Sequence, residues 1–175
     1  MFSLFGSKPH PAVEVLLPLL SPLLEAVKRT GQPLSRLVLD PYVSGYIAGV
    51  SGTVLKEQGL VGRQIGKAMV ALNERFGVDL AKGALRMSGQ EPDYVEGTRS
   101  GNLIAQYARG MDDFAGHPLI EQAIEGANIP YTAAHLAKTG EVAGVRQATR
   151  EEVAAMLVEH LFLEVVEKRL GAARG

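Results

Sequence analysis

Histidine and glutamate recur four residues apart in this chain, a spacing that can do chemistry. Three of the four histidines have a glutamate at the fourth following position, in the pairs His10 and Glu14, His117 and Glu121, and His160 and Glu164. On a helix this spacing puts both side chains on one face, as a metal site or a base with its orienting carboxylate requires. Proline follows the first two histidines, so we expect those pairs at helix starts, where the glutamate favours the positive end of the helix dipole.

His160 and Glu164 are the candidate metal ligands, because they alone fall in the middle of an expected helix. A di-metal helical bundle would need two Glu-x-x-His motifs, and the sequence has none. We therefore favour a polar pair facing another helix or subunit, and we expect neither a metal nor a cofactor.

A second cluster lies in the run RGMDDFAGH, which brings an arginine, two carboxylates and a histidine to one helix end. The candidate catalytic residues are Arg109, Asp113 and His117. Asp113 or His117 would act as general base and Arg109 would steer an anion. A solvated helix terminus is the plainer interpretation. No nucleotide-binding or nucleophile-elbow motif is present, so enzymatic activity stays open and we favour a protein without it.

Glycines punctuate an otherwise apolar helix expected over Pro41–Gln58. Gly45, Gly49 and Gly52 fall on one narrow face of that helix. Each interior glycine costs about 1 kcal/mol relative to alanine. Something close to the backbone must therefore compensate for a face that carries almost no side chains.

Three arrangements would compensate for the free-energy cost of these glycines. The first is close packing against the following helix, which carries Gly62 and Gly66 at the same spacing. The second is a ligand in the groove, and the third is a helix pair across a homodimer axis. The candidate ligand-binding residues are Tyr42, Gly45, Tyr46 and Gly49. We favour packing within one chain.

Prolines mark most of the expected helix starts. The apolar periodicity predicts helices over Pro11–Leu20, Pro22–Arg29, Pro41–Gln58, Leu60–Phe76, Val78–Met87, Pro92–Phe114, Pro118–Gly126, Pro130–Lys138 and Thr149–Leu170. Ser21 and Asp40 are the expected N-caps of two of them. The expected fold class is therefore all-α, a single domain over 1–175 of about seven or eight helices, with the glycine-rich helix at its centre and an apolar C-terminal helix, and we expect residues 1–10 to form a flexible N-terminal segment.

The last helix, Thr149–Leu170, begins with a capping box and is apolar on most of its circumference. Such a helix is normally enclosed by others or by a second subunit. Leu157 and Leu161 are the candidate interaction residues, and we expect a homodimer.

Two short runs of the sequence resemble other runs in the same chain. Tyr42–Gly49 resembles Tyr94–Gly101, and His10–Glu14 resembles His117–Glu121. The separations of the two pairs disagree, so a single duplication does not produce both.

Composition narrows the function. The formal charge is −1 with scattered basic residues, which excludes a nucleic-acid footprint, and the absence of cysteine suits a reducing cytoplasm. No apolar run spans a membrane comfortably. We expect a soluble, cytoplasmic, non-enzymatic interaction or scaffold module that self-associates. The alternatives are a small-molecule-binding protein or cofactor-free enzyme, with a pocket near Tyr42 and Tyr46 or near Asp113 and His117, and a peripheral membrane protein using residues 1–8.

Overall fold

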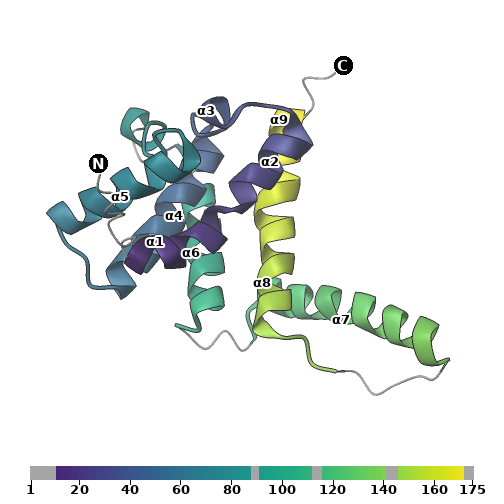
Figure 1. The fold of residues 1–175 in the computed structure, drawn as a ribbon. Helices are drawn as coiled ribbons and strands as arrows, with labels where there is room; N and C mark the ends of the chain where they lie inside the picture. The colour runs from purple at the N-terminus through teal and green to yellow at the C-terminus, as the bar shows by residue number, and fades with distance from the viewer. Residues whose placement is uncertain (1–10, 88–90, 112–115, 141–145, 172–175) are drawn as a thin grey trace, which may run out of the picture.

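The computed structural model describes residues 11–87, 91–111, 116–140 and 146–171 and is built from helices alone over that part of the chain (Figure 1). In chain order the elements are α1 (Pro11–Leu20), α2 (Pro22–Thr30), α3 (Leu34–Leu37), α4 (Pro41–Glu57), α5 (Arg63–Phe76), the 3₁₀ turn η1 (Ala84–Arg86), α6 (Pro92–Arg109), α7 (Pro118–Thr139), α8 (Arg150–Val158), the π-helical turn η2 (Glu159–Leu163) and α9 (Glu164–Leu170). The predicted all-α fold class is confirmed. The expected flexible segment 1–10 lies outside the described residues.

Local sequence explains where several helices begin and end. Asp40 caps α4 as predicted, because its carboxylate accepts from the backbone N–H groups of Tyr42 and Val43. Thr149 and Glu152 form the predicted capping box at the start of α8. Ser21 occupies the N-cap position of α2 as predicted, but its hydroxyl donates to the Pro18 carbonyl and makes no capping hydrogen bond.

Four of the predicted helices differ from the structure. The two helices expected around Pro130 are one helix, α7, which continues through that proline. The helix expected over Val78–Met87 is reduced to the 3₁₀ turn η1. The helix that begins at Pro92 ends at Arg109, because Gly110 adopts the left-handed conformation with a φ of 62°.

Helix α4 lies at the centre of the fold, as the sequence predicts. Its side chains are buried on nearly the whole circumference, between α1 on one side and α6 on the other. Helices α8, η2 and α9 form one long rod that closes the core with Leu157, Phe162 and Val166 (Figure 1). Helix α5 lies at the periphery against α1.

The glycine face of α4 packs directly against α6. A Cβ atom at Gly45 would overlap the Tyr94 carbonyl oxygen and lie 2.9 Å from the Thr98 backbone nitrogen. One turn later, a Cβ at Gly49 would overlap the Thr98 carbonyl. The two backbones are therefore too close for any side chain, and the helices run parallel because both residue numbers increase together.

Helix α6 supplies matching glycines. A Cβ at Gly97 would overlap the Tyr42 carbonyl, and one at Gly101 would lie 3.0 Å from the Val50 backbone nitrogen. Packing within one chain is thus confirmed, but the predicted partner helix is wrong. Gly62 begins α5 with a φ of 49°, and Gly66 has no atom within 4 Å of its Cβ position.

The echo between Tyr42–Gly49 and Tyr94–Gly101 is the sequence signature of this helix pair. The contact of Gly45 with Tyr94 becomes the contact of Gly97 with Tyr42 when the two helices exchange places. Helices α4 and α6 are therefore related by a local two-fold pseudosymmetry along their common direction.

An arginine holds the starts of these two helices together. Arg169 of α9 donates to Asp93 at 2.8 Å and lies 3.4 Å from Asp40, so it spans the starts of both helices. Its guanidinium also lies 5.8 Å from the centre of the Tyr42 ring. The hydrogen bond from Arg169 lowers the pKa of the Asp93 carboxyl.

Candidate functional site

The tyrosines proposed to line a ligand groove are part of the core. Tyr46 has no exposed surface, its ring stacks on Phe162 with a centroid distance of 4.0 Å, and its hydroxyl donates to the Leu19 carbonyl at 2.7 Å. Burial raises the pKa of Tyr46 well above its usual range. This hydroxyl is satisfied and enclosed, so it is not available to a ligand.

Tyr42 is equally enclosed. Its hydroxyl lies 3.1 Å from the Ser100 hydroxyl and donates to the Leu161 carbonyl in η2. A π turn interrupts the regular hydrogen-bond pattern of a helix, and here Tyr42 uses one of its carbonyls. Burial raises the pKa of Tyr42. Since α6 covers Gly45 and Gly49, the structure leaves no open groove at the four candidate ligand-binding residues.

Of the three candidate catalytic residues, the structure describes Arg109 and His117. Arg109 pairs with Glu57 at the end of α4, at 2.8 Å between Nη2 and Oε1. The hydrogen bond from Arg109 lowers the pKa of the Glu57 carboxyl. His117 stands at the N-cap position of α7, as its following proline predicts. Asp113 lies outside the described residues.

His160 and Glu164 do contact each other, at 3.1 Å between Nδ1 and Oε1. The pair is partly exposed on the surface of the rod. Within the described ranges, no group of three or more histidine, cysteine or carboxylate side chains gathers as a metal site would need. The geometry there is that of a surface polar pair.

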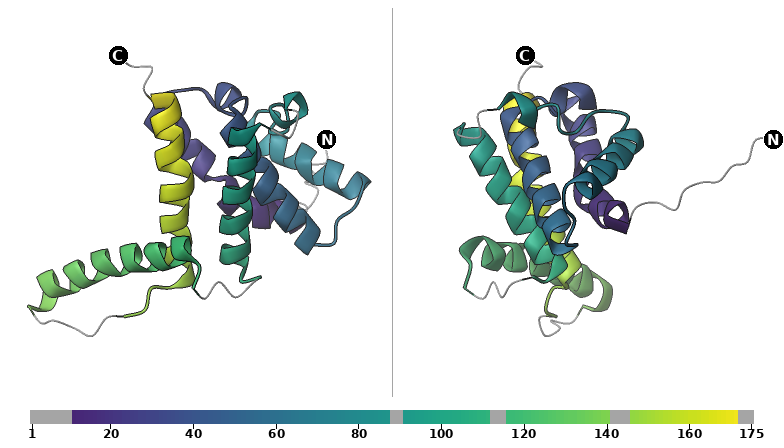
Figure 2. Two further views of the ribbon diagram at one scale, coloured as in Figure 1. Left: turned by 180° about the vertical axis from the view of Figure 1, so that it is seen from behind. Right: turned by 90° about the vertical axis from the view of Figure 1, so that its left-hand side faces the viewer.

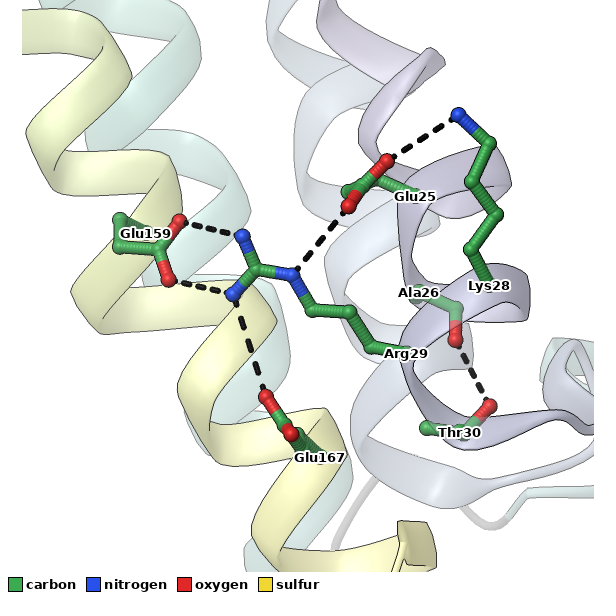
Figure 3. A network of polar contacts seen from close by, with 7 residues as sticks. All are labelled: Glu25, Ala26, Lys28, Arg29, Thr30, Glu159 and Glu167. Carbon is green, nitrogen blue, oxygen red and sulfur yellow. Dashed lines mark hydrogen bonds and ion pairs between the residues drawn. The ribbon is translucent and has the colours of Figure 1, made fainter.

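The last helix packs within its own chain. Leu157 is 1% exposed and contributes to the core, and Leu161 is half-buried, so Leu157 is not available to a second subunit. A polar network also fixes this helix to α2 (Figure 3). Arg29 forms a two-pronged contact with Glu159 and a further one with Glu25 at 3.4 Å. The bond to Glu159 raises the pKa of the Arg29 guanidinium.

The most exposed helix is α7, which the sequence did not single out. It projects from the lower end of the rod, away from α1–α6, as Figure 1 and the left view of Figure 2 show. Its first half packs on α8 through Ile120 and Ala123, which are buried, and through Ala127. Among the α7 side chains that the structure describes beyond Ala127, none joins the hydrophobic core. We call residues 128–139 the distal arm.

The distal arm presents an apolar face to solvent. Ile129 is 69% exposed and Leu136 is 47% exposed. With their neighbours they line a shallow groove of about 600 Å³, formed by Glu125, Asn128, Ile129, Thr132, Ala133 and Leu136. These positions recur at intervals of three and four residues, so they share one helix face. Glu125 is the one charged residue of that lining.

A signal for this face was present in the sequence. The spacing of Ile129, Thr132 and Leu136 is that of an amphipathic helix, but dividing the segment at Pro130 hides it. Exposure could not be predicted from the pattern, because an apolar stripe normally faces the core.

Comparison with known proteins adds no relative. No protein-family model, no curated protein and no solved structure matches this chain. In the described part of the chain, no helix combines the length and apolar character needed to cross a bilayer.

Proposed function

We propose that this protein is a non-enzymatic helical interaction module that self-associates through the distal arm of α7. The observation that carries the proposal is the exposure of Ile129 and Leu136 on one face of a helix that leaves the body of the fold. Contiguous exposed apolar surface marks interaction sites on soluble domains.

The arm also needs support to remain helical. Residues 128–139 rise roughly 18 Å and continue a helix whose first half is already packed on α8, so they are held by helix propagation alone, which is close to neutral in water. Pro130 weakens this one further, since it removes a helix hydrogen bond. A partner that covers the apolar face would supply the missing packing energy.

A second copy of the chain fits that face. Symmetric dimers use one patch twice, so the patch must be complementary to itself. Here the large side chains of Ile129 and Leu136 alternate with the small ones of Thr132 and Ala133. Two arms related by a two-fold axis can place the large residues of one beside the small residues of the other.

The size of the face sets the expected strength. Stable complexes bury about 800 Å² on each partner, and a helix segment of roughly 18 Å offers less than that. We therefore expect a reversible dimer that forms at micromolar or higher concentration.

The test is sedimentation velocity over a concentration series with the double variant Ile129→Ser and Leu136→Ser. Neither side chain belongs to the hydrophobic core, so the variant should keep the melting temperature of the folded body, and any loss of helical content should be limited to the arm. The matched control is Val70→Ser, which removes a 57% exposed apolar side chain from α5 instead. The parent chain and the control should dimerise and the arm variant should not. A parent chain that stays monomeric throughout, or an arm variant that dimerises equally, contradicts the proposal.

A further inference from the structure

A second apolar groove lies between α1, the start of α2 and the end of α5. Its apolar lining comes from Leu17 and Pro18 of α1, Leu24 of α2 and Phe76 of α5, and its volume is about 580 Å³. Leu24 is 50% exposed there. Glu14 and Arg75 also line it, so the groove carries one charge of each sign.

We propose that this groove binds the N-terminal segment of the same chain, residues 1–10, folded back along α1. That segment contains Phe2, Leu4 and Phe5, and it joins the fold at Pro11, where α1 begins. The groove runs beside the same helix, so the segment and its docking surface are adjacent in sequence.

The chain is long enough to reach. An extended chain covers up to about 3.4 Å per residue, so Phe5 lies within roughly 20 Å of Pro11 and Phe2 within roughly 30 Å. Leu17 and Pro18 are about 10 Å from Pro11 along α1. A reversal at Pro9–Pro11 therefore brings the phenylalanines beside Leu17 and Leu24 with length to spare.

The charges agree with this direction. Lys8 is the one charged side chain of residues 1–9, and the reversal places it beside the first turn of α1, where Glu14 stands. Glu14 makes no ion pair with any other described residue. Lys8 would complete it, while the uncharged stretch that precedes Lys8 covers the apolar part of the groove.

The absence of cysteine permits a direct test. Ser3→Cys carries a single nitroxide label, and the intensities of the backbone amide signals are compared between its oxidised and reduced forms. The proposal expects loss of most of the signal at Leu17, Leu24 and Phe76 and none at Leu136 in the distal arm. The matched variant keeps the label and changes Phe2, Leu4 and Phe5 to Ser; it should recover the signals without any change in fold.

Two other outcomes overturn the proposal. Signals at the groove that stay intact show that the segment does not dock there, and addition of anionic phospholipid vesicles then tests whether it binds a membrane surface instead. A second sample mixes spin-labelled chains without ¹⁵N and ¹⁵N-enriched chains without the spin label. Loss of the groove signals in this mixture shows that the segment docks on a second copy of the chain. Repeating the mixture with the Ile129→Ser and Leu136→Ser variant separates that outcome from dimerisation through α7.

Discussion

Replacement of Gly49 by alanine tests the contact that organises the fold. The added methyl group would overlap the Thr98 carbonyl oxygen and lie 2.9 Å from the Asn102 backbone nitrogen. Both are backbone atoms of a helix, so neither can rotate away as a side chain would. Helices α4 and α6 must separate by about 1 Å to restore ordinary contact distances.

The magnitude follows from two opposing terms. Overpacking a core costs about 1–3 kcal/mol and sometimes more, and we take about 3–4 kcal/mol here because the clash is with backbone atoms that cannot rotate away. Alanine returns about 1 kcal/mol of helix propensity. We expect Gly49→Ala to lower the free energy of unfolding by about 2–3 kcal/mol, and the melting temperature by about 5–10 °C for a chain of this length.

The matched control is Gly52→Ala in the same helix. Gly52 is exposed, and no atom lies within 4 Å of its Cβ position. Alanine at this position gains helix propensity without a clash, so we expect Gly52→Ala to raise the free energy of unfolding by up to about 1 kcal/mol. Urea unfolding followed by far-UV circular dichroism measures both variants under the same conditions.

A double variant extends the test. Gly101→Ala forces apart the same two helices, so adding it to Gly49→Ala should cost less than the sum of the single changes, by about 1 kcal/mol or more. If Gly49→Ala unfolds at the same urea concentration as Gly52→Ala, the helices do not approach as described and the reasoning fails.

Two further perturbations probe the contacts around this pair. Tyr46→Phe removes a buried hydroxyl that donates to the Leu19 carbonyl but keeps the ring stacked on Phe162. We expect urea unfolding to show a decrease of about 1–2 kcal/mol in the free energy of unfolding. An unchanged midpoint would mean that this hydrogen bond does not contribute to stability. The pKa of Glu57 is lower in the folded chain than its unfolded value near 4.3, because Arg109 donates to it, so its contribution is complete above that value and is lost as the pH falls through the folded pKa. Both side chains are partly exposed, which limits the effect to about 1 kcal/mol. Glu57→Gln should therefore unfold more easily than the parent chain at pH 7 but lose less stability between pH 5 and pH 3 in urea titrations, and parallel pH curves for the two chains would show that the pair is not coupled to folding.

The sequence by itself determined the helical character of the chain and most of the helix ends. Prolines at the first turn, the Asp40 cap and the Thr149 capping box act through atoms only a few residues apart, so their effects are local. The burial of α4 was also predictable, because a helix with apolar residues around its circumference must be enclosed.

Tertiary structure decided which helix the glycines meet. The spacing in Gly62 and Gly66 is as suitable as that in Gly97 and Gly101, and only the packed arrangement selects the second pair. The resemblance of Tyr42–Gly49 to Tyr94–Gly101 carried the answer, but a repeat in sequence does not state that its two copies touch.

Tertiary structure also decided the candidate sites. Tyrosines such as Tyr42 and Tyr46 are common in ligand pockets, and leucines such as Leu157 are common in interfaces. In this structure all three are buried in contacts within the chain. The distal arm is left exposed for the opposite reason. Local sequence determines whether a segment is helical and which of its faces is apolar; whether another element covers that face depends on the path of the whole chain, because burial is set by contacts between residues far apart in sequence.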